Sequence, residues 1–422
     1  MLLHWKDSLP DWYIKKYGKQ PCVNIGTAGH VDHGKTTLIQ ALTGNWTSVH
    51  SQELKRGITI RVGYSDAAFY KCKDCESPLG YSTEPKCHNC GKESELSRVI
   101  SFVDSPGHES LMANMLSGSA LMDGALLLVA ANSKVPQPQT KEHLLALQIL
   151  GIKQIVIVQN KVDLISHKDA LSNYSEITKF VKGTKAASSP IIPISAQSSL
   201  NMDALIGAIE ETIETPARDV SSDTVMHVLR SFDINKPGTK IKNLKGGVIG
   251  GSITQGKLSV GDEIEIKPGI INSKKKSYQS IQTEIVSLGT GAGIVDEVKS
   301  GGLIAIGTKL DPSLSTSDSL IGSVVGKPGT LPENSMEAKL KISLFDFAIG
   351  SAGETKVAPI TVGELLRVNV GTAPVPAKVN KVKSDNIEVE FKRPVCLFAK
   401  GNVALSRRIA ERWRLIGAGI VG

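Results

Sequence analysis

This 422-residue sequence lacks the features that would place a protein in or across a membrane. No apolar run approaches the ~20 residues that a helix needs to span a bilayer. The first residues, MLLHWKDSLPDWYIKK, carry Asp7 and Asp11 inside their most apolar part and offer no small-residue cleavage site, so we expect no secretory signal. These absences predict a cytoplasmic protein with no membrane partner.

Cysteine is scarce as well. The chain has six cysteines: four lie close together between residues 72 and 90, whereas Cys22 and Cys396 lie in apolar, strand-like settings. This usage favours a metal site over a disulfide framework. Acidic residues are outnumbered, 41 to 49, and the resulting net charge of +8 fits an anionic partner such as nucleic acid. The length suffices for about two to four domains.

The segment GHVDHGKTT, residues 29–37, carries the strongest signature. It follows an apolar run at 22–28 that predicts a buried strand, and residues 36–42 have helical spacing of apolar positions. The pattern Gly29-x4-Gly34-Lys35-Thr36 between strand and helix is typical of a nucleotide-phosphate loop. Glycine lets backbone N–H groups approach phosphate oxygens, Lys35 would reach the β- and γ-phosphates, and Thr36 would offer its hydroxyl to Mg²⁺.

Two further segments suit a switch that responds to the terminal phosphate. RGIT, residues 56–59, lies in a polar loop before a predicted strand at 64–70, which makes Thr59 the candidate for a second Mg²⁺ ligand. A predicted strand at 99–103 runs into DSPGH, where Asp104 would steady the Mg²⁺ shell through water and the Gly107 N–H would sense the γ-phosphate. His108 could orient the attacking water, or be a loop histidine without that role.

Two motifs predict recognition of guanine. A strand at 155–158 leads to NKVD, where Asp163 can accept hydrogen bonds from both the N1–H and the 2-amino group of guanine, a pairing that adenine lacks. A second strand, 190–194, leads to SAQ, whose backbone N–H groups can contact guanine O6. The candidates for the base pocket are Asn160, Lys161, Val162, Asp163, Ser195, Ala196 and Gln197.

The clustered cysteines form two CxxC pairs separated by eleven residues. Four thiolates satisfy Zn²⁺ tetrahedrally and leave no open position, so we expect a structural or docking zinc knuckle at residues 70–92. A zinc ribbon that contacts nucleic acid and a redox pair of CxxC motifs are the alternatives. His88 lies inside the second pair, but four cysteines make it unnecessary as a ligand. The predicted Zn²⁺ ligands are Cys72, Cys75, Cys87 and Cys90.

The order of the predicted elements defines the fold class. Strands and helices alternate up to a helix at 202–214, so we expect an α/β P-loop domain, residues 1–217, with a parallel-rich sheet and the inserted knuckle. From about residue 218, short alternating segments broken by Gly, Pro and Asn predict two antiparallel β-barrels, at 218–328 and 329–422. The barrels carry basic runs, each of which is usually a solvated face: Lys240, Lys242 and Lys245; residues 274–276; and Arg407, Arg408, Arg412 and Arg414.

GHVDHGKTTL, RGIT, DSPGH, NKVD and SAQ occur in an order that resembles translational GTPases of the elongation-factor-Tu class. The cysteine knuckle between RGIT and DSPGH, together with ARDVSSD, SFDINKPGTKI, LKGGVIGGSI, KRPVC and SRRIAERWRLIGAGI, is similar to the gamma subunits of archaeal and eukaryotic translation initiation factor 2. The resemblance covers essentially the whole chain. The short N-terminus and lack of added tails favour the archaeal form.

The resemblance implies a GTPase that carries methionyl initiator tRNA in its GTP-bound state. Such a protein works with alpha and beta subunits in a heterotrimer, delivers the tRNA to the small ribosomal subunit with mRNA, and releases it after hydrolysis. Residues Asp32 and Gly57 would hold a second Mg²⁺ in some states, while Val31 and Ile58 would screen the water from His108. The residues implied to contact the GTP phosphates are Asp32, His33, Gly34, Lys35, Thr36 and Thr37.

Three other functions are open at this point. An elongation-type or selenocysteine-specific factor would ordinarily lack the knuckle. A GTP-driven regulator of a metabolic enzyme, such as one for sulfate adenylylation, is disfavoured by the knuckle and the basic C-terminal half. A zinc scaffold that binds GTP without hydrolysing it is disfavoured by the intact Lys35, Thr36, Thr59 and His108. Ser105, where many relatives have Ala, leaves the neighbouring Asp104 and Gly107 unchanged.

Overall fold

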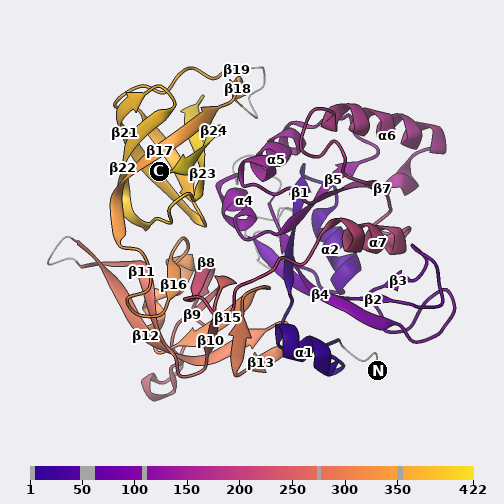
Figure 1. Ribbon diagram of the computed structural model, residues 1–422, viewed down its shortest axis with the longest axis horizontal. Coiled ribbons are helices and arrows are strands. Elements are labelled where there is room, and N and C mark those ends of the chain that lie inside the picture. The colour runs from indigo at the N-terminus through magenta and orange to yellow at the C-terminus, as the bar shows by residue number, and fades with distance from the viewer. Residues whose placement is uncertain (1–4, 48–61, 107–111, 273–276, 349–354) are drawn as a thin grey trace. The chain divides into compact units, whose positions relative to one another are not determined.

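The computed structural model describes residues 5–47, 62–106, 112–272, 277–348 and 355–422 (Figure 1). These residues divide into two compact units. Pro21–Pro216 form one unit, and Asp11–Gln20 join Ala217–Gly422 in the other. Within the described ranges, no helix has the length and apolarity required to cross a membrane.

The first unit is built on a seven-stranded sheet in the order β3-β2-β4-β1-β5-β6-β7. Its central strands are parallel: β1 pairs with β4 and β5, β5 with β6, and β6 with β7. The strands are β1 (Val23–Gly29), β2 (Gly63–Lys71), β3 (Tyr81–Ser82), β4 (Glu95–Asp104), β5 (Gly124–Ala130), β6 (Ile155–Asn160) and β7 (Ile191–Pro193). This sheet confirms the predicted α/β class.

Helices cover the sheet (Figure 1), and β1, β5 and β6 are buried along their entire length. Burial on both faces explains why these strands read as continuous apolar runs and not as alternating ones. The helices are α2 (Lys35–Thr43), α4 (Met112–Ser119), α5 (Pro138–Ile149), α6 (His167–Val181) and α7 (Met202–Thr212), with the 3₁₀ helix η3 (Val162–Leu164) after β6.

The second unit contains two closed antiparallel barrels. In the first, the order β11-β16-β8-β9-β15-β12 closes because β11 also pairs with β12. Its core is aliphatic and includes Ile249, Ile266 and Ile306. The strands are β8 (Val225–Phe232), β9 (Val248–Gln255), β10 (Lys257–Ser259), β11 (Glu263–Asn272), β12 (Ser277–Thr290), β13 (Gly293–Val295), β14 (Glu297–Lys299), β15 (Ile304–Thr308) and β16 (Val324–Gly326), and the 3₁₀ helices are η4 (Ile241–Asn243), η5 (Pro312–Leu314) and η6 (Thr316–Asp318).

The second barrel closes in the order β17-β22-β21-β20-β23-β24. Alternate residues of β21 point into its core, for example Val375, Ala377 and Val379, which is the pattern expected of a strand with one buried face. The strands are β17 (Asn334–Leu344), β20 (Leu365–Val370), β21 (Ala373–Lys383), β22 (Asn386–Cys396), β23 (Asn402–Ile409) and β24 (Arg412–Val421), with the small pair β18 (Phe347–Ala348) and β19 (Thr355–Lys356) beside them.

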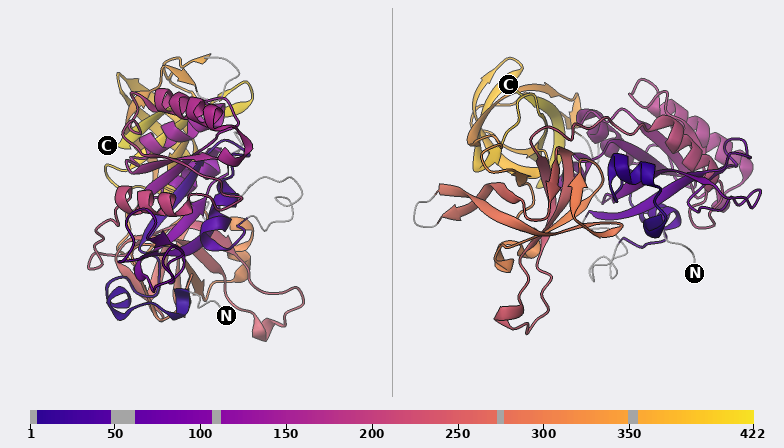
Figure 2. Two further views of the ribbon diagram at one scale, coloured as in Figure 1. Left: turned by 90° about the vertical axis from the view of Figure 1, so that its right-hand side faces the viewer. Right: turned by 60° about the horizontal axis from the view of Figure 1, so that its bottom comes forward.

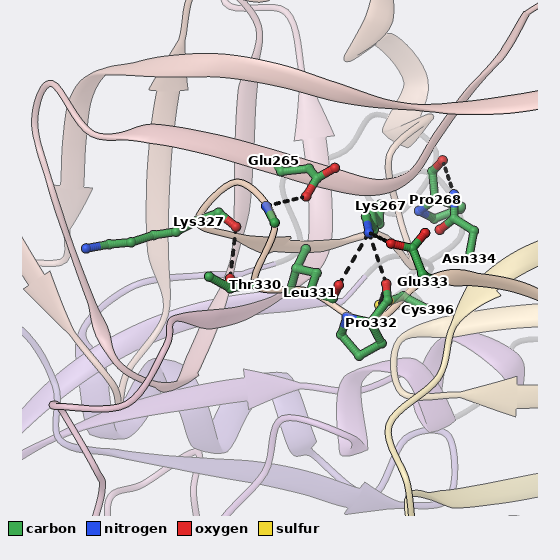
Figure 3. A network of polar contacts seen from close by, with 11 residues as sticks. Glu265, Lys267, Pro268, Lys327, Thr330, Leu331, Pro332, Glu333, Asn334 and Cys396 are labelled. Carbon is green, nitrogen blue, oxygen red and sulfur yellow. Dashed lines mark hydrogen bonds and ion pairs between the residues drawn. The ribbon is translucent and has the colours of Figure 1, made fainter.

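A short linker joins the two barrels and is fixed by polar contacts (Figure 3). The Lys267 ammonium on β11 is buried and donates to the Leu331 and Pro332 carbonyls at 3.3 Å each. The Gly329 N–H donates to the Glu265 carboxylate at 3.1 Å, and the Asn334 amide donates to the Pro268 carbonyl at 3.0 Å. The linker is thus bonded to one strand along its length.

An N-terminal helix, α1 (Asp11–Tyr17), follows the 3₁₀ helix η1 (Trp5–Asp7) and belongs with the barrels. Gln20 makes this attachment: its amide donates to the Lys299 and Gly301 carbonyls and accepts from the Lys299 N–H, at 2.7 to 2.8 Å. The sequence analysis grouped these residues with the GTP-binding domain. The contact of Gln20 shows that the chain first touches a barrel and then enters β1.

The basic runs differ in their surroundings. Lys240, Lys242 and Lys245 are exposed on a loop that carries η4 and projects from the first barrel (Figure 2). Arg407, by contrast, is mostly buried and pairs with Glu364, with Nε and Oε1 2.5 Å apart. Arg414 is 8% exposed. The C-terminal run is therefore partly a packing element and not a uniformly solvated face.

Candidate functional site

The loop after β1 has the backbone of a phosphate loop. Gly29 has φ 137° and Gly34 φ 89°, conformations that favour glycine. A Cβ on Gly29 would lie 2.5 Å from the Leu128 carbonyl oxygen, and one on Gly34 would lie 2.3 Å from Asn160 Nδ2. Both glycines of the signature are therefore required by conformation and by space, and α2 begins directly after them at Lys35.

Lys35 crosses the loop from the first position of α2. Its Nζ donates to the Gly29 carbonyl at 2.9 Å and to the His30 carbonyl at 2.7 Å. Burial lowers the pKa of Lys35 to about 8, against the opposing attraction of Asp104 and Asp32. A desolvated ammonium at the start of a helix is well suited to bind an anion, because little water has to be displaced from it.

Asp104 is the last residue of β4, and its carboxylate accepts hydrogen bonds from hydroxyl groups of three segments. Its Oδ2 accepts from Thr36 and from Thr47 at 2.7 Å each, and its Oδ1 accepts from Thr27 at 3.3 Å. The carboxyl is fully buried, and burial raises its pKa while the hydroxyl donors and Lys35 oppose the rise. These are the hard oxygen ligands that Mg²⁺ prefers, gathered beside the phosphate loop.

Asn160 joins the phosphate loop to the predicted base pocket. Its Nδ2 donates to the His33 carbonyl at 2.9 Å, and its Oδ1 accepts from the Ala196 N–H at 3.0 Å. The side chain is 2% exposed, so both bonds are shielded from water. NKVD and SAQ thus meet at one side chain, as the sequence predicts for a shared pocket.

The residues next to Asn160 differ in backbone conformation and in burial. Lys161 adopts a left-handed backbone conformation with φ 65°, and the Val162 N–H donates to the Ile194 carbonyl at 3.2 Å. Asp163 is exposed, whereas Ser195 is buried and its Oγ accepts from the Ser198 N–H at 3.3 Å. Ala196 is buried and Gln197 is exposed.

Some predicted site residues lie outside the described part of the chain. They are the switch residues Gly57 and Thr59, with Ile58 of the predicted apolar screen, and Gly107 and His108 of DSPGH. Their roles stay predictions. Among the described candidates, Lys35, Thr36, Asp104 and Asn160 are brought together by the contacts above.

The four cysteines converge as predicted. Their sulfur atoms lie within 4.8 Å of one another, with Cys72 Sγ and Cys90 Sγ 3.5 Å apart and Cys75 Sγ and Cys87 Sγ 3.8 Å apart. A tetrahedron with Zn–S bonds of ~2.3 Å has S···S edges of about 3.8 Å, so the cluster has the size of a zinc site. Backbone N–H groups of Cys90 and Asn89 lower the pKa of the Cys87 thiol to about 7, which favours the thiolate.

The cluster is anchored on α7. Tyr81 is 7% exposed, and a Cβ on Gly207 of α7 would lie 3.1 Å from its ring, so the two pack closely. Behind this contact, Arg98 of β4 pairs with Glu210, with Nε and Oε1 2.7 Å apart and both side chains nearly buried. His88 is exposed and pairs with Glu84 at 3.7 Å, consistent with a role other than that of a ligand.

Sequence analysis missed three residues of the site: Thr27 and Thr47, which donate to Asp104, and His143, whose Nδ1 accepts from the Gly29 N–H at 2.8 Å. The available signals were weak. Thr27 is a polar residue inside a fully buried strand, and His143 lies among buried residues of α5. Buried polar side chains are usually hydrogen-bonded, so the sequence indicates that such a residue has a partner but does not indicate which residue the partner is.

The fold and the site together define a P-loop GTPase unit followed by two β-barrels. Residues 20–215 match the family of the elongation factor Tu GTP binding domain, and residues 336–421 match the C-terminal domain of initiation factor eIF2 gamma. The chain is 55% identical to translation initiation factor 2 subunit gamma of Archaeoglobus fulgidus, covering 95% of this chain and 94% of that one. It is 53% identical to the same subunit of Methanocaldococcus jannaschii, covering 96% and 99%. The chain belongs to the translation initiation factor 2 gamma family, and it is a translation initiation GTPase that binds GTP and GDP.

Solved structures agree on the fold. A bacterial selenocysteine-specific elongation factor EF-Sec superposes with a TM-score of 0.72 at 21% identity, over 94% of this chain and 58% of that one. The elongation factor SelB from Methanococcus maripaludis, in complex with the GTP analogue GppNHp, gives 0.69 at 23% identity, over 94% and 78%. At such identities the likeness concerns architecture alone.

Proposed function

We propose that this GTPase, in its GTP-bound state, carries methionyl initiator tRNA to the small ribosomal subunit with its mRNA and releases the tRNA after GTP hydrolysis. It does so together with alpha and beta subunits of the same factor. Its family and its two barrels support this proposal. The observation that carries it is the convergence of Thr36 and Thr47 on Asp104, which links the phosphate loop to the segment that leads to Thr59.

The nucleotide contacts follow from this arrangement. Backbone N–H groups of the phosphate loop and the Lys35 ammonium bind the phosphates, Asp163 selects guanine, and Asn160 holds the two halves of the pocket in register. The complete set that we propose to contact GTP is Asp32, His33, Gly34, Lys35, Thr36, Thr37, Asp104, Gly107, Asn160, Lys161, Val162, Asp163, Ser195, Ala196 and Gln197.

The donor set beside the phosphates fits Mg²⁺. A bound Mg²⁺ would neutralise phosphate charge as hydrolysis proceeds. Thr36 offers its hydroxyl and Asp104 a buried carboxylate, both oxygen donors. Thr59 would add a second hydroxyl, and Asp32 with the Gly57 carbonyl would hold a second ion in some states. His108 would orient the attacking water behind the screen of Val31 and Ile58, a role that predicts slower hydrolysis with retained GTP binding in His108→Ala.

The cysteine cluster fits one Zn²⁺ held by Cys72, Cys75, Cys87 and Cys90. The spacing of the sulfur atoms matches a closed tetrahedral site, which leaves no position for a substrate. The knuckle, residues 70–92, is therefore a structural or docking element. We propose that it belongs to a GTP-binding domain assigned to residues 1–217, whose compact unit is formed by Pro21–Pro216, and that the barrels span 218–328 and 329–422.

The barrels would supply the surface for RNA. Lys240, Lys242 and Lys245 are exposed on the projecting loop, which Asn235 closes by donating to the Lys245 carbonyl at 2.7 Å and accepting from its N–H at 2.8 Å. A closed loop that presents three ammonium groups can meet phosphates. Such contacts bind any tRNA, so selection of the methionylated initiator has to come from its shape and its aminoacyl end.

Equilibrium binding of the heterotrimer to charged tRNA tests the proposal. We expect much tighter binding of methionyl initiator tRNA with GTP than with GDP, and a log–log salt slope of roughly −0.7 to −0.9 for each phosphate that is neutralised. Changing Lys240, Lys242 and Lys245 to Gln should make that slope shallower, whereas the same change at the exposed Lys378, Lys381 and Lys383 of β21 should not. Equal binding of initiator and elongator tRNA would favour an elongation-type factor, and preference for selenocysteinyl-tRNA a selenocysteine-specific one.

A further inference from the structure

The first residue of the phosphate loop is held by a side chain from outside every nucleotide motif. His143 lies on α5, is 1% exposed, and its Nδ1 is 2.8 Å from the backbone nitrogen of Gly29. The Gly29 carbonyl accepts from Lys35 Nζ at 2.9 Å. Two consecutive peptide groups are therefore fixed, one by His143 and the next by Lys35.

The bond defines the chemical state of the imidazole. A backbone N–H can only donate, so Nδ1 of His143 carries no proton and the neutral ring is protonated at Nε2. Burial holds the pKa of His143 well below its usual value, and Lys35, His30 and His33 lower it further. His33 has the opposite tautomer, because its Nδ1 donates to the Leu128 carbonyl at 3.0 Å.

We propose that His143 is a positioning residue of the nucleotide site: its Nδ1 fixes the Gly29 peptide, so that the loop and Lys35 present their donors to the phosphates in one arrangement. The inference rests on the proposed contact of this loop with the GTP phosphates. His143 itself touches no substrate in this scheme. It acts only through the backbone.

Conformation explains why an outside group is needed. Gly29 has φ 137°, in the region that only glycine enters readily, and it has no side chain through which packing could hold it. Freedom of this kind lets the chain make the turn, but it also lets the peptide rotate. An acceptor for the Gly29 N–H restricts this rotation before the ligand binds, so that less conformational entropy is lost on binding.

Three substitutions separate the hydrogen bond from packing. His143→Leu fills the space but has no acceptor, whereas His143→Asn keeps an acceptor at the position of Nδ1. Thr140→Val is the matched control, since Thr140 is also buried on α5 and its hydroxyl has no hydrogen-bond partner in the described structure. We expect His143→Leu to weaken GTP and GDP binding about 10-fold, from the loss of one buried hydrogen bond, and His143→Asn and Thr140→Val to stay within about 3-fold of the parent.

Two measurements complete the test: nucleotide affinity by fluorescence titration, and the ¹⁵N spectrum of His143, where we expect an unprotonated Nδ1. A protonated Nδ1, or equal losses in His143→Leu and His143→Asn, would overturn the inference. Lys35→Ala distinguishes it from the proposed function. If Lys35→Ala loses GTP binding while His143→Leu keeps parental affinity, only the role of His143 fails; if Lys35→Ala keeps it, the phosphate loop assignment fails too.

Discussion

Replacing Asn160 tests whether the two halves of the nucleotide pocket depend on one side chain. Its amide joins the His33 carbonyl and the Ala196 N–H at 2.9 and 3.0 Å in a site where the side chain is 2% exposed. Asn160→Ala leaves both groups without this partner. A buried polar group left unpaired costs about 1–3 kcal/mol, so the two together should destabilise the unit by roughly 2–6 kcal/mol.

The assay is thermal unfolding of the nucleotide-free protein, followed by GDP titration. For a unit of this size, 1 kcal/mol lowers the unfolding temperature by about 2–4 °C, so a decrease of at least about 4 °C is expected for Asn160→Ala. Asn160→Asp should be no better: it can accept from Ala196 but places an oxygen against the His33 carbonyl. GDP affinity should decrease at least about tenfold in both variants, because the two loops no longer share a fixed distance.

Asn380 provides the matched control. It is exposed on β21, and its amide donates a hydrogen bond to Glu390 at 3.3 Å. Asn380→Ala should change stability by less than about 0.5 kcal/mol. If Asn160→Ala unfolds at the parental temperature and keeps parental GDP affinity, the bridge through Asn160 contributes nothing and the reasoning is refuted.

Four other variants test separate parts of the structure. Asp163→Asn should lose GTP affinity and gain affinity for XTP, because an amide can donate to the 2-oxo group of xanthine; an unchanged GTP/XTP ratio would remove Asp163 from the pocket. Metal analysis should find one Zn²⁺ per chain in the parent protein and none in Cys87→Ser, with GTP hydrolysis by the folded protein unchanged; full zinc content in Cys87→Ser would contradict the site. Burial lowers the pKa of His227 to about 4, below its unfolded value near 6.5, so stability of the barrel unit should fall as pH drops through this window, and His227→Gln should flatten that dependence in acid unfolding. Ala410 and Glu411 form a two-residue hairpin turn with φ 46° and 62°, so Ala410→Asn with Glu411→Gly should raise the unfolding free energy by about 1 kcal/mol in urea titrations; no gain would show that the turn is not strained.

The sequence predicted strands best where an apolar run was followed directly by a functional motif. Apolar runs ending in motif residues predicted β1, β4 and β6 to within a few residues, because a strand buried on both faces has little freedom in composition. The direction of β2 was not predictable. It runs antiparallel to β4, and the hydrophobic pattern of a strand contains no information about its direction.

Helix α6 was missed although a local signal exists. Its buried residues are Asn173, Ile177 and Val181, which lie four positions apart and form one narrow buried stripe on an otherwise polar helix. Its start is marked all the same: the Ser166 Oγ accepts from the Asp169 N–H at 3.2 Å, an N-cap with an acidic residue three positions later. Asn160, Asp104 and His143 illustrate the other limit, since their partners lie on segments far away in the sequence.

The position of the cysteine cluster links the proposed zinc site to the proposed nucleotide site through the fold. Tyr81 of the knuckle packs on α7, α7 supplies Glu210 to Arg98, and Arg98 lies on β4, the strand that ends at Asp104. Breaking a buried ion pair from one side costs about 3–5 kcal/mol, far more than a surface contact. We therefore expect the knuckle to stabilise β4 near Arg98, at the end of the strand opposite Asp104. Loss of the metal should lower the stability of β4 and α7 and leave the chemistry of Lys35 and Thr36 unchanged. Metal content and GTP hydrolysis therefore have to be measured on the same folded sample.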